Sequence, residues 1–469
     1  MNGTAPEHLQ ALEAMGPSGQ WACERIIALT LENLQLKEQL GAAQTCCRQL
    51  EERLGQLQQQ AYRQAAPFRR AEPERNPHPG RPGRKAGHAG RFRPQPDHID
   101  EAIHVALESC PHCGGALSQK RPLVQYIEEI PVVRPRVTQL TTEEGWCAHC
   151  QKEVYSTHPL QTGRAGGAAA AQLGPRALAL ACDLNKAKGL SMRKTAAILD
   201  EHFGLKITAG GLALLVQRVG RRLQPQYEQM ALELRQSAVV HADETSWWVG
   251  GPGWWLWVFA TANITLYVVI QSRAAAVALA VLGETFAGVL VSDCLAVYDD
   301  LNPLQQKCYS HHLKAVSEAL QTLGAGGSDY LRQVQALLRT ALLLKAMQGL
   351  APDERLAVCL NTLKTRAHAL LDAPRPQAIE EKVRMRLWKQ RDHLFTFLER
   401  VEVPATNNLA ERQLRPAVIA RKISCGNKTE KGARAWAVLA SLAATCRQTG
   451  GSVINDISSR VLLQPVRGP

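Results

Sequence analysis

The sequence contains no apolar run long enough to cross a bilayer, since the longest, residues 274–283, stops at Glu284. Residues 1–20 lack a basic segment followed by an apolar one, so we expect no secretory signal. The thirteen cysteines are odd in number and mostly scattered through core-like segments, which favours a reducing compartment over a disulfide framework. These absences argue against a secreted, membrane-spanning or fibrous protein.

The composition is that of a folded, basic, multidomain chain. Its 469 residues predict roughly three domains at about 150 residues each. With 45% hydrophobic and 21% charged residues, most of the chain can bury a core. The net charge of +13 indicates a polyanionic partner, nucleic acid before a membrane surface.

Nearly all of that charge lies in two short segments. Residues 61–95 carry nine basic side chains against two acids, and residues 411–434 carry seven against two. A generally basic protein would not concentrate its charge in this way. The pattern favours two phosphate-contacting surfaces.

Residues 26–57 follow a heptad pattern that predicts a two-stranded coiled coil, which we place over residues 21–60. A lone Asn33 in one core column favours a parallel homodimer. The alternative is an amphipathic helix docked on its own domain. The two heptad columns are Ile26, Asn33, Leu40, Cys47, Leu54 and Leu29, Leu36, Ala43, Leu50, Leu57.

Residues 61–96 are rich in proline, glycine and arginine and predict a flexible basic arm. Such an arm can follow a phosphate backbone or insert arginine into a minor groove, with Arg81, Arg84 and Lys85 as candidate DNA contacts. The alternative is a solvated linker.

Two Cys-x-x-Cys pairs predict a four-cysteine zinc ribbon over residues 97–160, with a strand-like stretch at 124–140 between them. The thiolates of Cys110, Cys113, Cys147 and Cys150 can enclose a tetrahedral Zn²⁺ and leave no position open for catalysis, so the ion would be structural. A redox dithiol is disfavoured, because it would need one such pair at a helix start.

Residues 165–230 have helical periodicity and predict a DNA-binding domain that resembles a helix-turn-helix. A first helix runs through 193–199, a turn lies at 203–205, and a second helix starts near Thr208. Lys206, Thr208 and Arg218 would then face DNA. Many helical hairpins share this pattern, so a purely structural hairpin is the alternative.

Residues 236–450 predict an α/β catalytic core of the RNase H-like class. Three antiparallel strands are expected at 239–249, 254–261 and 265–271, then a helix at 273–282 and a parallel strand at 288–292. Asp243 lies in the first strand and Asp293 follows the last. Neighbouring strands would bring both carboxylates to one edge, where hard oxygen ligands suit Mg²⁺.

A third acid comes from residues 404–415, which predict a helix start with Thr406 as the N-cap. Asn407, Glu411 and Arg415 fall on one face of this helix at four-residue spacing. With Glu411, the set Asp243, Asp293 and Glu411 suffices for two Mg²⁺ or Mn²⁺ ions.

The chain resembles the DDE transposases of bacterial insertion sequences, most closely the insertion sequence 66 class. The motifs that carry the resemblance are residues 80–88, 241–245, 291–293 with Tyr298, 308–311, 407–412, 421–426 and 432–434. The resemblance implies that Asp243, Asp293 and Glu411 bind the catalytic metal ions. It also implies a helical insertion at about 313–400 and a cytoplasmic, nucleoid-associated bacterial protein. We expect residues 451–469 to form a C-terminal tail.

Other residues in and near these motifs are candidates for supporting roles, some with an alternative. Strand alternation allows only one of Asp243 and Glu244 to face the metals. His311 and Asn407 are candidates for phosphate positioning, or they fill the core and orient Glu411. Cys308 is expected to be a packing residue, and the tryptophans of 247–257 core rather than base-stacking residues. Arg412, Arg415, Arg421 and Lys422 are candidate DNA contacts.

Three functions remain open at this point. The first is a transposase that binds terminal repeats of double-stranded DNA, cleaves phosphodiesters and transfers strands. The second is a catalytically silent DNA-binding regulator or architectural protein derived from a transposase. The third is a structure-selective nuclease. Metal-dependent cleavage separates the first from the second, and strand joining separates it from the third.

Overall fold

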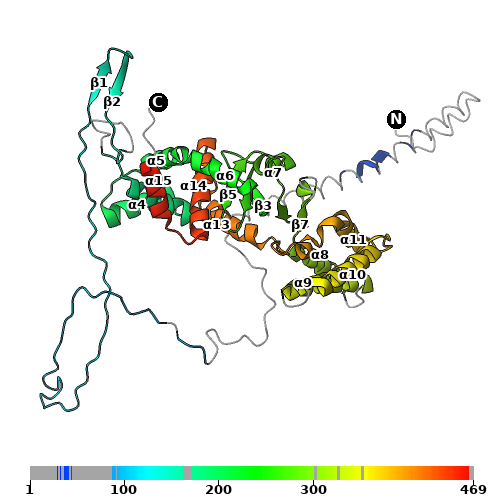
Figure 1. Ribbon diagram of the computed structural model, residues 1–469, viewed down its shortest axis with the longest axis horizontal. Helices are drawn as coiled ribbons and strands as arrows, with labels where there is room; N and C mark the ends of the chain where they lie inside the picture. Colours follow the sequence, from blue (N-terminus) through cyan, green and yellow to red (C-terminus); the bar gives the residue numbers. More distant parts are fainter. Residues whose placement is uncertain are drawn as a thin grey trace, which may run out of the picture. The chain divides into compact units, whose positions relative to one another are not determined.

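The computed structural model describes residues 87–90, 92–161, 171–299, 301, 304–324, 328–349 and 353–463, with eight further helical positions between 29 and 44 (Figure 1). The chain divides into two units, residues 1–94 and residues 95–469. No helix among these residues is both long and apolar enough to cross a membrane.

The first unit contains helical residues from the segment that the sequence predicts as a coiled coil. Leu29, Leu36 and Leu40 are helical and leave 42%, 55% and 59% of their surface exposed. Exposed leucines at heptad positions suit a helix that pairs with another. The remaining heptad residues lie outside the described residues, as do Arg81, Arg84 and Lys85 of the predicted arm.

The cysteine-rich segment contains one regular hairpin, formed by antiparallel strands β1 (Glu144–Cys147) and β2 (Lys152–Tyr155). The strand predicted over 124–140 is absent, and that prediction is wrong. Side chains there, such as Ile127 and Val132, are about nine-tenths exposed. Alternating apolar residues make a strand only where a second strand accepts the backbone hydrogen bonds, and this stretch has no such partner in the described part of the chain.

The helical domain contains α3 (Pro175–Cys182), the π-helix η2 (Asp183–Ala187), α4 (Met192–Phe203), α5 (Ala209–Arg222) and α6 (Gln224–Arg235). The α4–turn–α5 pair lies where the sequence predicted it. Gly204 ends α4 with φ +65°, and the Thr208 hydroxyl caps α5 by accepting the Gly211 N–H. Lys206 and Arg218 are exposed on this pair.

The sheet has five strands in the order β5-β4-β3-β6-β7. The antiparallel strands β3 (Val239–Trp247), β4 (Trp254–Ala260) and β5 (Thr265–Ile270) are followed by α7 (Ala275–Leu282). The strands β6 (Val289–Ser292) and β7 (Gln305–Lys307) then run parallel to β3, separated by the 3₁₀ turn η3 (Ala296–Tyr298). The expected strands and helix are therefore present, each within about two residues of its predicted bounds.

Alternation along the strands divides the core. Val240, Ala242 and Leu290 pack on one side with residues of α5, α6, α7 and the later helix α14 (Glu430–Gln448), while Val239, Val289 and Val291 belong to a core with the helices between residues 309 and 389. A third core packs β3–β5 under α13 (Asn408–Ser424) and α14. Buried Trp247, with its ring centroid 4.7 Å from that of Trp436, lies there, so at least this tryptophan is a core residue as expected.

The predicted helical insertion consists of α8 (Tyr309–Leu323), α9 (Asp329–Met347), α10 (Asp353–Leu371), α11 (Ala378–Lys389), the 3₁₀ turn η5 (Arg391–His393) and α12 (Thr396–Glu399). The chain then returns to the sheet with α13 (Asn408–Ser424) and α14 (Glu430–Gln448). Hydroxyls of α14 cover the outer edge of β5, where Thr445 accepts the Thr265 N–H at 2.9 Å and Ser441 accepts that of Tyr267 at 2.8 Å.

The segment predicted as a C-terminal tail is instead partly structural. Residues 453–463 form α15 (Val453–Leu463), which contacts α3 and buries Val453, Ile457 and Val461 in the first core. The prediction missed the apolar residues at i, i+4 and i+8, which give this short helix one buried face.

Candidate active site

Asp243 and Asp293 occupy matching positions on neighbouring parallel strands. The paired register of β3 and β6 ends at His241 and Val291, and each aspartate lies two residues further along the chain. Asp293 directly follows β6, where its Oδ1 accepts the backbone N–H of Leu295 at 2.9 Å. The shared register brings the two acids side by side at the edge where β6 ends, although β3 itself continues to Trp247.

The electrostatics of Asp243 reflect the acids around it. Burial above all, together with the negative charges of Asp293, Glu244 and Glu411, raises its pKa to about 7, against one backbone hydrogen bond from Glu244 that lowers it. A buried carboxylate beside other acids is unfavourable as an anion unless a cation accompanies it. The arrangement is therefore suited to a divalent ion with oxygen ligands.

Glu411 reaches this edge because Asn407 fixes the start of α13. Asn407 is fully buried, and its side chain donates to the Ala242 carbonyl at 2.7 Å and bonds to His241 Nδ1 at 3.0 Å. The N-cap of α13 is Asn407 rather than the predicted Thr406. A contact of Asn407 with phosphate does not fit this burial. The alternative role, in which Asn407 orients Glu411 one helical turn further along, does fit it.

His311 and Cys308 border the same edge. Cys308 precedes α8 and is fully buried, and the backbone N–H of Asn407 donates to its sulfur at 3.2 Å. Burial alone would raise the pKa of the Cys308 thiol, but hydrogen bonds with His311 and Asn407 outweigh it and lower the pKa. The hydrogen bond to Cys308 raises the pKa of His311 despite partial burial, and the charges of Asp293 and Glu411 add to this.

Glu244 does not belong to the acidic edge. Its carboxylate pairs with the Arg273 guanidinium at 2.9 Å and accepts the hydroxyl of Tyr298, both on the opposite face of the sheet from Asp243. Strand alternation thus places the two adjacent acids on opposite faces of the sheet, where they have different partners. This agrees with the prediction that only one of Asp243 and Glu244 can face the metals. Glu244 anchors the loop that contains Tyr298.

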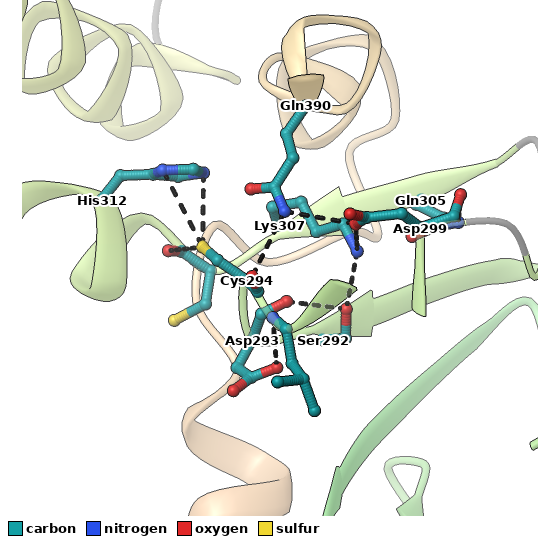
Figure 2. A network of polar contacts seen from close by, with 10 residues as sticks. Ser292, Asp293, Cys294, Asp299, Gln305, Lys307, His312 and Gln390 are labelled. Carbon is teal, nitrogen blue, oxygen red and sulfur yellow. Dashed lines mark hydrogen bonds and ion pairs between the residues drawn. The ribbon is translucent and has the colours of Figure 1, made fainter. Parts of the chain in front are cut away.

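A polar network behind Asp293 connects the sheet to the helical insertion (Figure 2). The fully buried Lys307 of β7 pairs with Asp299 at 2.8 Å and donates to the Ser292 hydroxyl at 3.4 Å. Gln390, after α11, donates to Asp299 at 3.2 Å and to the Cys294 carbonyl at 3.4 Å. These bonds hold the chain on both sides of Asp293.

The roles of Lys307 and Gln390 were not predicted from the sequence. Strand β7 has only three residues, Gln305–Lys307, too few to reveal an alternation that would predict a buried lysine. For Cys308, interpreted as packing alone, the Cys-x-x-His spacing with His311 was an available signal.

The predicted DNA-contacting cations of α13 fall into two groups. Arg412 and Arg415 are exposed beside Glu411. Arg421 is half-buried instead, where its guanidinium donates to the Thr245 hydroxyl at 3.1 Å and to Ser246. Arg421 therefore binds α13 to β3, and Lys422, the next residue, is also half-buried.

The two cysteine pairs lie in turns of the same design. In both, the residue after the second cysteine has a positive φ, +71° at Gly114 and +49° at Gln151. In the first turn the Cys110 N–H donates to Gly115 O at 2.9 Å, and in the second the Sγ atoms of Cys147 and Cys150 are 3.1 Å apart. Backbone hydrogen bonds, from His112 above all for Cys110 and from Cys150 for Cys147, lower both pKa values. The pairs do not meet: among the described residues, the one group of three or more ligands within 4.8 Å is Cys308, His311 and Glu411.

The site thus combines acids from two neighbouring strands and from helix α13 at one edge of a mixed sheet. Carboxylate sets of this kind can hold the divalent ions that enzymes of phosphodiester chemistry use. The model of the transposase IS66 family matches residues 170–435, more than half of the chain. The chain belongs to this transposase family.

A curated relative adds little about activity. An uncharacterized protein, y4qI, of Sinorhizobium fredii (strain NBRC 101917 / NGR234) is 24% identical over 295 residues, covering 54% of this chain and 53% of the relative. The chain thus spans about half the length of that protein.

Proposed function

We propose that the protein is a DNA transposase that binds the ends of its insertion sequence and carries out divalent-metal-dependent phosphodiester cleavage and strand transfer. The core from 236 to 450 would be RNase H-like, which the strand order β5-β4-β3-β6-β7 supports. The observation that carries the proposal is the register that sets Asp243 beside Asp293, with the charges of Asp293 and of Glu411, from a distant helix, both acting on Asp243.

The donor set at this edge fits two Mg²⁺ or Mn²⁺ ions, because three carboxylates supply hard oxygen ligands and the neighbouring charges that raise the pKa of Asp243 are all negative. Held by Asp243, Asp293 and Glu411, such ions would supply activation of a water or 3′-hydroxyl and stabilisation of the leaving oxygen. The chain's own residues keep the ligands in place. The His241–Asn407 hydrogen bond fixes α13, and the Lys307–Asp299 pair supports the chain beside Asp293.

The remaining segments would hold two DNA ends together. We infer a coiled-coil homodimer from 21–60, a DNA-tracking arm from 61–96, a structural Zn²⁺ ribbon from 97–160 and a helix-turn-helix-like reader from 165–230. Exposed Lys206 and Arg218, with Arg412 and Arg415, supply cations for phosphate contacts. The matching turns around Cys110–Cys113 and Cys147–Cys150 fit zinc, which would draw the two pairs together.

The test is cleavage of DNA that carries the flanking ends of the element, in the presence of Mg²⁺, with cleaved phosphodiesters mapped to the nucleotide. Asp243→Ala should abolish cleavage and strand joining while leaving end binding intact. Binding by the unaltered protein without metal-dependent cleavage would instead assign a regulatory or architectural role. Cleavage of branched DNA without strand joining would assign a nuclease.

A further inference from the structure

A second set of potential ligands lies beside the acidic edge. One ligand atom each of Cys308, His311 and Glu411 lies within 4.8 Å of the others. This set differs in chemistry from the three carboxylates, since it combines a sulfur, an imidazole nitrogen and a single carboxylate oxygen. Ligands of this kind select Zn²⁺ and similar thiophilic cations over Mg²⁺.

The fold builds this group from two helix N-termini. Cys308 is the N-cap of α8 and His311 lies in its first turn, so the i, i+3 spacing places both on one face. Glu411 lies in the first turn of α13. The Tyr309 N–H donates to Ala405 O at 2.9 Å, which holds the start of α8 against the segment that leads into α13.

The surroundings of Cys308 suit a metal-bound thiolate. Its sulfur accepts the Asn407 N–H at 3.2 Å, and the N-terminal end of α8 favours negative charge at this position. Cys308 is fully buried, whereas His311 and Glu411 are partly exposed. An ion could therefore enter from the solvent side and keep an open coordination position, as three-ligand zinc sites do.

We propose that Cys308, His311 and Glu411 form a site for a thiophilic divalent cation of the Zn²⁺ class, separate from the oxygen-only site. Because Glu411 belongs to both sets, Zn²⁺ bound at the sulfur would withdraw this carboxylate from Asp243 and Asp293. Zinc would then inhibit Mg²⁺-dependent cleavage. This consequence rests on the proposed function, whereas binding of the cation does not.

Binding is tested with a full-length parent chain in which Cys110→Ser and Cys147→Ser remove the cobalt signal of the two cysteine pairs. This parent chain is freed of metal with a chelator and titrated with Co²⁺, and a thiolate-to-cobalt charge-transfer absorption is expected. The absorption should disappear when Cys308→Ser is added and persist when Cys359→Ser, which alters an exposed cysteine of α10, is added. His311→Gln, which keeps the thiol, should weaken Co²⁺ binding at least tenfold. An absorption unchanged by Cys308→Ser, or none in the parent chain, overturns the site.

Inhibition is tested on cleavage of end DNA in Mg²⁺, with each protein's rate in added Zn²⁺ expressed relative to its own rate without it. The unaltered chain and Cys359→Ser should lose at least tenfold in rate, and Cys308→Ser should lose less than twofold. Equal inhibition of all three proteins overturns the shared-ligand mechanism. A chain that cleaves no DNA overturns the proposed function, and the cobalt measurement still decides the site.

Discussion

Asn407 and His241, 166 residues apart in sequence, form a buried hydrogen bond of 3.0 Å that joins the start of α13 to the central strand of the sheet. Burial lowers the pKa of His241 to about 4, so the ring is neutral at neutral pH. The His241 Nδ1–H then donates to the Asn407 carbonyl oxygen, and the Asn407 amide donates to Ala242 O. This pair sets where Glu411 lies relative to Asp243.

The first prediction concerns that pair. Asn407→Ala leaves two buried polar groups without partners and should lower the free energy of unfolding by about 2–3 kcal/mol. It should also reduce Mg²⁺-dependent cleavage at least tenfold, because α13 loses its fixed start. Asn408→Ala, which alters the exposed neighbour, is the matched control and should change neither quantity appreciably. Urea denaturation and cleavage rates of both variants decide the point.

The second prediction concerns pH. Asp243 has its pKa raised from 3.8 to about 7, chiefly by burial and then by the neighbouring acids. Between these values the folded state holds a proton that the unfolded state has lost, so stability falls as pH rises through this window. The loss is on the order of 4 kcal/mol above pH 7 in the absence of metal. Below pH 3.8 this contribution vanishes.

The measurement is the free energy of unfolding at pH 5 and pH 8 in a metal chelator, compared between the unaltered chain and Asp243→Asn. The difference between the two proteins should grow with pH, in favour of the variant. Added Mg²⁺ should restore stability at pH 8 to the unaltered chain alone. A difference that does not change with pH would contradict the cause given for the pKa.

The third prediction concerns the network behind Asp293. Lys307→Met removes the cation that pairs with Asp299 and donates to Ser292, and should cost about 3 kcal/mol in stability. Gln390→Ala, which removes the bonds from the insertion, should cost about 1 kcal/mol. Lys314→Met, on an exposed part of α8, is the control. Cleavage should fall in both network variants if this network positions Asp293.

Local patterns in the sequence predicted four of the five strands of the sheet and the α4–α5 pair, because these elements have enough residues to show their period, whereas the helical insertion was implied by the family resemblance. The contacts that separate Asp243 from Glu244 could not be predicted in this way. A pattern within one segment shows that the two acids face opposite sides of the sheet. The residues that bind Glu244, Arg273 and Tyr298, come from distant segments. The same limit hid the pairing of Lys307 with Asp299, and the exposed stretch at 124–140 lacked the partner that a strand requires.

The fourth prediction concerns zinc. If one ion joins both cysteine pairs, Cys110→Ser and Cys147→Ser should each remove the same zinc equivalent, since tetrahedral closure needs both turns. If each pair binds its own ion, each variant should remove only half of the zinc. Metal content after gel filtration, measured in a Cys308→Ser background, distinguishes these outcomes. Equal and complete loss in both variants is expected.

The last prediction concerns the turn that follows α13. Gly426 has φ +92°, and a Cβ at this position would lie 2.4 Å from the backbone oxygen of Trp248. The next residue, Asn427, is bound to the same hairpin, donating its N–H to Trp248 O at 2.8 Å and accepting from Trp247 Nε1 at 2.9 Å. The turn therefore cannot move away without breaking these bonds.

Gly426→Ala should consequently lower stability by about 2–3 kcal/mol, through backbone strain together with displacement of the α13 end from β3. Gly251→Ala is a control in the same hairpin, because nothing lies within 4 Å of its Cβ position and its φ is not positive. Thermal unfolding of the two variants should separate them clearly. Equal stability would show that the end of α13 is held by Arg421 and its bonds to Thr245 and Ser246 rather than by this turn.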